Sequence, residues 1–97
     1  MVTHKEKIVI KNREPFDDED GWQFLVKLGK FEFIIDVDRE YWMDLTEEKM
    51  TPEELVQESF RFLLEREPKE SILSQFNLQT IQRYFPEYEN TIKVAIT

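Results

Sequence analysis

Carboxylates are the most abundant side chains of this 97-residue sequence that could do chemistry. The chain holds 21 Asp and Glu residues, no Cys and a single His. Without Cys there is no disulfide framework, no thiolate zinc site and no cysteine nucleophile. A serine triad needs a base, and His4, close to the N-terminus, is poorly placed to supply one. Two glycines are too few for a glycine-rich phosphate loop.

The acid-rich stretches raise the question of a calcium loop, because hard cations take carboxylate oxygens at alternate loop positions. Aligning Gly21 with the turn glycine of such a loop puts Phe16 at the first ligand position and Lys27 at the last, where carboxylates are needed. A loop that starts at Asp36 spaces its acids well but puts Tyr41 where the sharp turn needs Gly. We therefore expect no metal and no cofactor.

Paired carboxylates could also act as a general acid and a general base. An acidic chain offers such pairs by chance, and a useful pair must lie in a pocket that drives its two pKa values apart. Nothing in the sequence marks such a pair. We therefore predict that the protein is not an enzyme but a protein-interaction or regulatory module. The alternative is a small carboxylate-using hydrolase or a metal-binding protein.

The charge balance of the sequence limits the kinds of molecule that the protein can bind. Thirteen Lys and Arg against 21 acids give a net charge of −8, and the bases are scattered along the chain. Such a chain repels a phosphate backbone, so we expect no nucleic-acid partner. No run approaches the roughly 18 apolar residues of a membrane span, and the N-terminus lacks the apolar core of a signal peptide. We expect a cytoplasmic protein that binds no membrane and whose partner is a second copy or a basic protein.

Two alternating apolar runs between residues 22 and 38 predict a β-hairpin. They flank Gly29-Lys30, and Gly at the first central position suits a two-residue type II′ turn. The turn fixes the register. On one face it pairs Leu28 with Phe31, Val26 with Phe33, Phe24 with Ile35 and Trp22 with Val37. This face has no polar member and is the expected core face.

The other face of the hairpin carries a candidate partner-binding surface. The same register places Leu25 beside Ile34, and the opposite charges of Lys27 and Glu32 face each other next to that pair. We expect the apolar pair to be covered, either by the C-terminal segment 92–96 or a neighbouring helix, or by a second chain that docks there.

A helix from Thr51 to about Arg66 is the clearest element after the hairpin. Thr51 suits the N-cap, Pro52 the first helical position, and Glu54 completes a capping box. Its apolar residues cover an arc wider than a surface helix needs, which predicts that Leu63 is buried and that the helix packs against two other elements.

The remaining segments are less sharply patterned. We expect a strand at 7–11 and a solvated loop over 12–21. Residues 39–45 fit either an extension of the preceding strand or a helical turn, and we favour the turn. Pro68 suits the first turn of another helix, and Asn77 can cap a third.

The residues 92–96 fit either a strand or a helix, and this choice stays open. The elements together predict an α+β fold, with an antiparallel sheet of three or four strands that contains the hairpin and two or three helices packed on one face. At this length we expect one small domain over residues 1–97.

Two aromatic pairs, Tyr41-Trp42 and Tyr84-Phe85, could form a recognition surface, because Tyr and Trp concentrate in binding hot spots. Aromatic residues more often complete a small core. We therefore expect Trp42 and Phe85 to lie in the core or at its edge.

Parts of the sequence resemble known proteins. The segments TPEELV (51–56), SFRFLLEREP (59–68) and YFPEY (84–88) are similar to small bacterial proteins of no known activity, so this resemblance implies no site residue. The order of strands before a helix with an acidic start is similar to the partial ribonuclease-H-like domain of HicB-type antitoxins. The sequence departs from that pattern because the glycine-bearing turns expected before the helix are missing.

Overall fold

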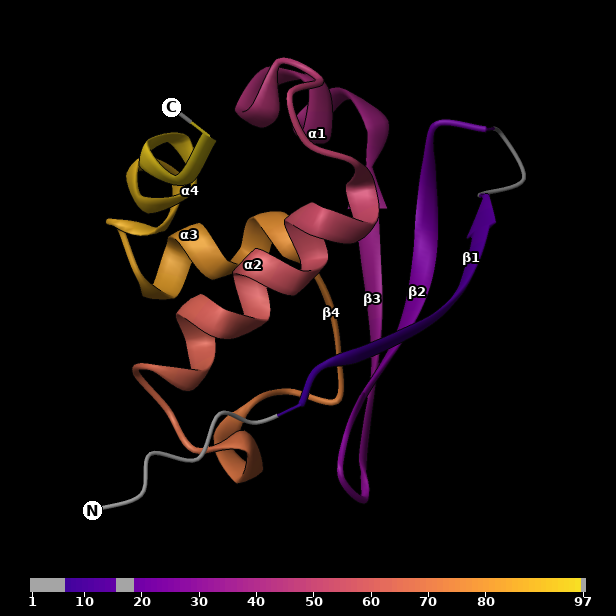
Figure 1. Cartoon of the computed structure of the whole chain (residues 1–97), viewed down its shortest axis with the longest axis vertical. Helices are drawn as coiled ribbons and strands as arrows, with labels where there is room; N and C mark the ends of the chain where they lie inside the picture. The colour runs from indigo at the N-terminus through magenta and orange to yellow at the C-terminus, as the bar shows by residue number, and fades with distance from the viewer. Residues whose placement is uncertain (1–6, 16–18, 97) are drawn as a thin grey trace.

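A computed structural model describes residues 7–15 and 19–96, apart from the side chains of residues 12 and 13. A four-stranded sheet of order β1-β2-β3-β4 is covered on one face by the helices (Figure 1). The elements are β1 (Val9–Pro15), β2 (Gly21–Leu28), β3 (Phe31–Asp38), α1 (Arg39–Thr46), α2 (Pro52–Leu64), η1 (Lys69–Ser71), β4 (Gln75–Asn77), η2 (Leu78–Thr80), α3 (Ile81–Tyr84) and α4 (Tyr88–Ile96).

The predicted α+β class is confirmed, with two corrections. The sheet is mixed rather than antiparallel, because β4 pairs parallel to β3. The described residues form four α-helices rather than two or three, since both the 39–46 segment and the C-terminal segment are helical.

The hairpin of β2 and β3 has the predicted register at every pair. Gly29 has a φ of +59°, the left-handed value that the first central position of a type II′ turn requires. The core face is buried as expected, and Val26 and Ile35 are fully inaccessible to solvent. Phe31, beside the turn, is the exception, with 36% of its surface exposed.

Helix α2 is stabilised at its start by the predicted capping box. The Thr51 hydroxyl accepts the Glu54 N–H at 3.1 Å, and the Glu54 carboxylate accepts the Thr51 N–H at 2.8 Å. The helix ends at Leu64, two residues before the expected end at Arg66. Leu63 is buried, as its place in the wide apolar arc predicts.

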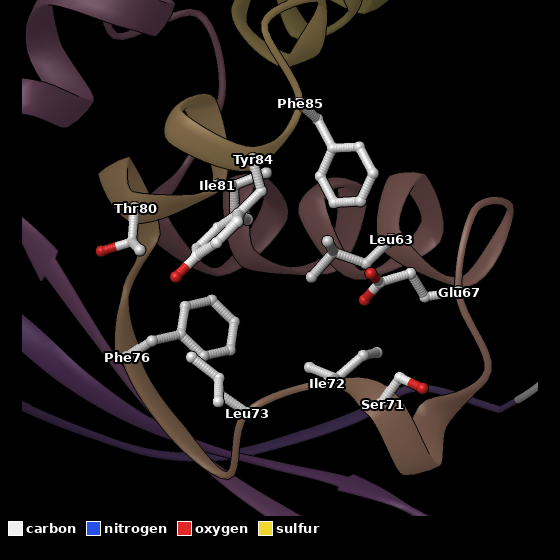
Figure 2. Close-up of a pocket in the computed structure, with 10 residues that line it drawn as sticks. All are labelled: Leu63, Glu67, Ser71, Ile72, Leu73, Phe76, Thr80, Ile81, Tyr84 and Phe85. Carbon is white, nitrogen blue, oxygen red and sulfur yellow. The ribbon is translucent and has the colours of Figure 1, made fainter.

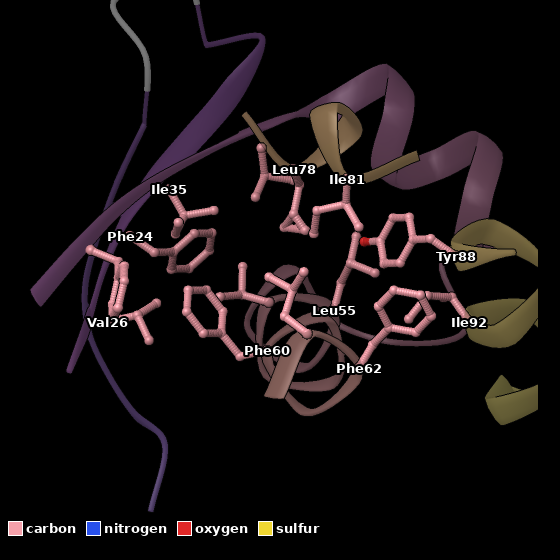
Figure 3. Packing of buried hydrophobic residues seen from close by; sticks show 14 of the residues in the cluster. Phe24, Val26, Ile35, Leu55, Phe60, Phe62, Leu78, Ile81, Tyr88 and Ile92 are labelled. Atoms are coloured by element: carbon pink, nitrogen blue, oxygen red, sulfur yellow. The ribbon is translucent and has the colours of Figure 1, made fainter. Parts of the chain in front are cut away.

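The core lies on both sides of α2 (Figure 3). Phe24, Val26 and Ile35 of the sheet face this helix on one side. Phe60 of α2 packs edge-on against Phe33, with 5.3 Å between the ring centroids. On the far side of α2, Tyr88 of α4 packs against the same helix. The wide apolar arc of α2 is therefore filled by the sheet and by α4.

The N-terminal strand is longer than expected. It runs from Val9 to Pro15 and pairs with β2, with an irregularity in register between Lys11 and Arg13. The prediction of a solvated loop from residue 12 is therefore wrong up to Pro15, because cross-strand pairing with β2 continues past the bulge. The acidic residues 17 and 18 lie outside the described residues.

The predicted helix from Pro68 is wrong. The chain makes only a short 3₁₀ turn at η1 and then forms the edge strand β4, in which Phe76 pairs with Ile35. Strand β3 needs partners for its backbone groups, and this requirement prevails over the weak helical pattern. Asn77 acts as a cap, as predicted: its side-chain oxygen accepts the Gln79 N–H at 3.1 Å and starts η2.

Candidate functional site

The segment from residue 63 to residue 85 forms a hollow of about 210 Å³ at the surface, which we call the apolar pocket (Figure 2). Helix α2, the chain from η1 to β4, and helix α3 supply its walls. Its lining residues are Leu63, Glu67, Ser71, Ile72, Leu73, Phe76, Thr80, Ile81, Tyr84 and Phe85.

The turn at η1 and the strand β4 bring the walls of the pocket together. The Ser71 N–H donates to the Pro68 carbonyl oxygen at 2.9 Å, and this turn directs the following chain back toward the sheet. Figure 2 shows Ile72 and Leu73 pointing into the hollow from one side and Tyr84 from the other. Strand β4 is thus the element that converts this stretch of chain into a pocket.

The floor of the pocket is buried and its rim is exposed. Leu63 and Ile81 on the floor belong to the hydrophobic core. On the rim, Leu73 is 57% exposed and Tyr84 is 68% exposed. Large apolar side chains that gather around a hollow are typical of a binding site, whereas scattered single ones are ordinary.

The connection between α3 and α4 carries Phe85, which lines one wall of the pocket, and contacts with α2 hold this wall in place. Phe85 packs edge-on against Phe62 with 5.7 Å between centroids. The Arg66 guanidinium lies over the Phe62 ring, with its central carbon 3.6 Å from the ring centroid. Its Nε donates to the Glu87 carboxylate at 3.0 Å. The backbone N–H of Glu87 and the Arg66 guanidinium hold the pKa of the Glu87 carboxyl below its usual range. The wall is therefore held in place without any ligand.

Glu67 is the one charged residue among the described residues that line the pocket. Figure 2 shows its carboxylate beside Leu63, turned toward the hollow. No hydrogen-bond or ion-pair partner for this carboxylate exists among the described residues. The neighbouring cations face elsewhere, because Arg66 binds Glu87 and the Lys69 ammonium lies 5.6 Å from the Phe31 ring.

The predicted surface on the outer face of the hairpin is assembled as expected. Leu25 pairs with Ile34, and the Lys27 ammonium lies 3.5 Å from the Glu32 carboxylate. Ile34 is 37% exposed, and no described helix covers the pair. The expectation that the segment 92–96 covers it is wrong, because α4 packs on the opposite side of the sheet, where its apolar residues reach the core.

The hydroxyls of Ser59, Tyr88 and Tyr41 are hydrogen-bonded within the fold. The Ser59 hydroxyl donates to the Leu55 carbonyl oxygen at 2.7 Å, so the Tyr88 hydroxyl is the donor in its 2.5 Å bond to Ser59. Burial raises the pKa of Tyr88, and burial also raises the pKa of Tyr41, whose hydroxyl donates to Glu89 at 2.9 Å. These bonds join α1 and α2 to α4.

Two acids of the possible calcium loop that starts at Asp36 already accept hydrogen bonds. Asp36 accepts the Gln23 amide at 2.9 Å, and Asp38 accepts the side-chain amides of Asn77 and Gln79 at 3.3 and 2.8 Å. Among the residues that the structure describes, no three His, Cys, Asp or Glu side chains come together in a way that could hold a metal ion.

The two aromatic pairs divide as expected. Trp42 lies at the core edge, where its indole N–H donates to the Met50 carbonyl oxygen at 2.8 Å and its ring meets Trp22 edge-on. Phe85 is also packed against the core, so both predictions are confirmed. Tyr84 is the member that faces solvent. Tyr84 and Leu73 could not be connected from the sequence, because the helix expected from Pro68 placed no strand between them.

Comparison of the chain with protein-family models, with curated proteins and with solved structures finds no match in any of the three. The likeness to small bacterial proteins and to HicB-type antitoxins stays a prediction. Within the described part of the chain, no helix has the length and apolar character needed to span a membrane.

Proposed function

We propose that this protein is a non-enzymatic interaction module that binds a segment of a partner protein in the apolar pocket. The observation that carries the proposal is the exposure of Leu73 and Tyr84, at 57% and 68%, around a hollow with a buried floor. A binding partner would remove this apolar surface from water. Tyr is also among the residues that contribute most to binding energy at interfaces.

The size and chemistry of the pocket support a docking role. Its volume of about 210 Å³ lies below the roughly 300–1,000 Å³ of small-molecule sites, so one or two side chains fit it better than a metabolite. Its polar groups are the Glu67 carboxylate and the hydroxyls of Ser71, Thr80 and Tyr84. Nucleophilic catalysis calls for a base that is hydrogen-bonded to such a hydroxyl, and among the described residues the Glu67 carboxylate makes no hydrogen bond to any hydroxyl of the lining.

The outer face of the hairpin is the second docking surface in this proposal, for a second copy or a basic protein. Leu25 and Ile34 form its apolar centre, and Lys27 and Glu32 would set orientation. It ranks below the pocket because its charges, Lys27 and Glu32, already pair with each other at 3.5 Å.

A capture experiment with four baits tests the proposal. The baits are the wild type, the double variant Leu73→Ser/Tyr84→Ser, the sheet variant Leu25→Asp, and the control Val94→Ser, which removes an exposed apolar side chain from α4. We expect a partner that the wild type, Leu25→Asp and Val94→Ser retain and the pocket variant loses. The purified partner should then bind the pocket variant at least about tenfold more weakly, a loss of about 1.4 kcal/mol.

Other outcomes separate the alternatives. Loss of the partner by Leu25→Asp alone would move the site to the outer sheet face. Equal capture by all four baits would contradict both surfaces. The carboxylate-using hydrolase or metal-binding alternative is tested by adding divalent metal ions and measuring the melting temperature, because specific binding at low metal concentration would raise it.

A further inference from the structure

The carboxylate of Glu67, which has no partner among the residues that the structure describes, gives the apolar pocket a chemical preference. The residue follows α2, and its own N–H is bonded to the Leu63 carbonyl oxygen at 2.8 Å, which fixes the backbone from which the side chain extends. The side chain is half-buried beside the apolar lining. Partial removal of a carboxylate from water without a partner costs free energy, and a cation supplied by a ligand would recover it.

The charges around this carboxylate favour a cation from outside the chain. No Lys or Arg is among the described residues that line the pocket. The nearest bases in sequence, Arg66 and Lys69, are directed at Glu87 and at the Phe31 ring. The chain as a whole carries a charge of −8, so a basic segment is attracted at long range before it docks.

We propose that the occupant of the pocket is a basic segment of a partner protein, in which a large apolar side chain lies within one helical turn of a Lys or Arg. This inference rests on the proposed docking function of the pocket. The apolar side chain enters between Leu73 and Tyr84, and the cation pairs with Glu67 at the edge of the hollow. Apolar contact supplies affinity and the ion pair supplies selection, because an acidic or neutral segment leaves Glu67 without a partner.

A display library of random linear peptides provides the probe for an unidentified ligand. The library is selected on the wild-type protein and counter-selected on Leu73→Ser/Tyr84→Ser, which has the same net charge. Counter-selection removes peptides that bind only because they are basic. We expect the enriched peptides to share a large apolar residue within one helical turn of a Lys or Arg.

A double-mutant cycle then measures the ion pair in an enriched peptide. Glu67→Gln should weaken binding by about tenfold, in the range of hydrogen bonds between charged groups. The same substitution should have no effect on the peptide in which the Lys or Arg is replaced by Gln. Glu70→Gln is the matched control, because it removes one carboxylate from the adjacent 3₁₀ turn but does not line the pocket, and it should leave the affinity unchanged.

Failure of this inference can be distinguished from failure of the docking function. Enriched peptides that are apolar without a basic residue, or equal losses in Glu67→Gln and Glu70→Gln, would overturn the basic occupant and leave the docking function intact. A library that yields no peptide preferring the wild type over the pocket variant would overturn both the docking function and this inference.

Discussion

The hairpin of β2 and β3 and the segment from residue 65 to residue 87 treat their apolar side chains in opposite ways. On the core face of the hairpin, residues such as Val26 and Ile35 are fully buried. In the second segment Leu78 and Ile81 are buried, but Leu73 and Tyr84 lie largely in solvent. Strict alternation assigns every hairpin side chain to one face, whereas a chain of short turns needs only a few anchors and leaves the others available for binding.

Truncation of an apolar side chain should show the largest difference between the two regions. Phe33→Ala removes a buried ring that packs against Phe60 and should lower the free energy of unfolding by about 3–5 kcal/mol. Leu73→Ala should change it by less than about 0.5 kcal/mol, since the side chain is mostly exposed. Urea unfolding of both variants measures this. A cost of about 2 kcal/mol or more for Leu73→Ala would mean that Leu73 belongs to the core.

Alkaline pH should reveal how firmly Tyr88, which directly follows the second segment, anchors α4 in the core. The raised pKa of its buried hydroxyl means that the unfolded state loses this proton first, near the ordinary pKa of about 10. The contribution to stability is present below that pH and is lost above it. Between about pH 10.5 and 11.5, the wild type should lose about 1.4 kcal/mol per pH unit more than Tyr88→Phe does. Parallel losses in the two proteins would show that the hydroxyl is not held neutral.

The N-cap of α2 tests whether the regular part of the fold depends on local signals. Thr51→Ala removes the acceptor of the Glu54 N–H and should cost about 1 kcal/mol in the free energy of unfolding. Thr91→Ala is the matched control, because its exposed hydroxyl donates only to the carbonyl oxygen of Glu87, the residue before α4. Equal costs in thermal unfolding would argue against a special role for the cap.

The ion pair between Arg66 and Glu87, beside the pocket wall, should have the smallest effect on stability of the four features. The lowered pKa of Glu87 means that its contribution to stability is present above the ordinary pKa of a glutamate and is lost as the pH falls through its own lowered value. Arg66→Gln should raise the pKa of Glu87 toward the ordinary range in a carboxyl-carbon NMR titration. An unchanged titration curve would show that Arg66 does not hold this carboxylate.

The regular half of the fold could be predicted from the sequence because its signals are local. Gly29-Lys30 specified the hairpin turn and every pair that follows, and Thr51 with Glu54 specified the start of α2. The pairing of Phe76 with Ile35 was missed, because it joins strands that lie far apart in sequence and three residues of edge strand leave no periodic signal.

The two candidate surfaces differ in the same way. The predicted outer-face pair Leu25–Ile34 follows from the hairpin register alone. The apolar pocket could not be predicted, because its walls come from α2, the η1–β4 chain and α3, and only the parallel strand β4 brings them together. Three pocket residues had a sequence signal: Leu63 as a buried helix residue, and Tyr84 and Phe85 as an aromatic pair.

The exposed residues Leu73 and Tyr84 are proposed to bind a partner segment, and the location of a bound peptide decides whether they do. Isotope-labelled protein is titrated with an enriched basic peptide, and the amide chemical shifts are followed by NMR. We predict that the large shift changes are confined to the pocket, from Leu63 and Glu67 through Leu73 to Tyr84, and that the amides of Leu25 and Ile34 stay in place. Changes centred on Leu25 and Ile34, with the pocket amides unmoved, would contradict this assignment.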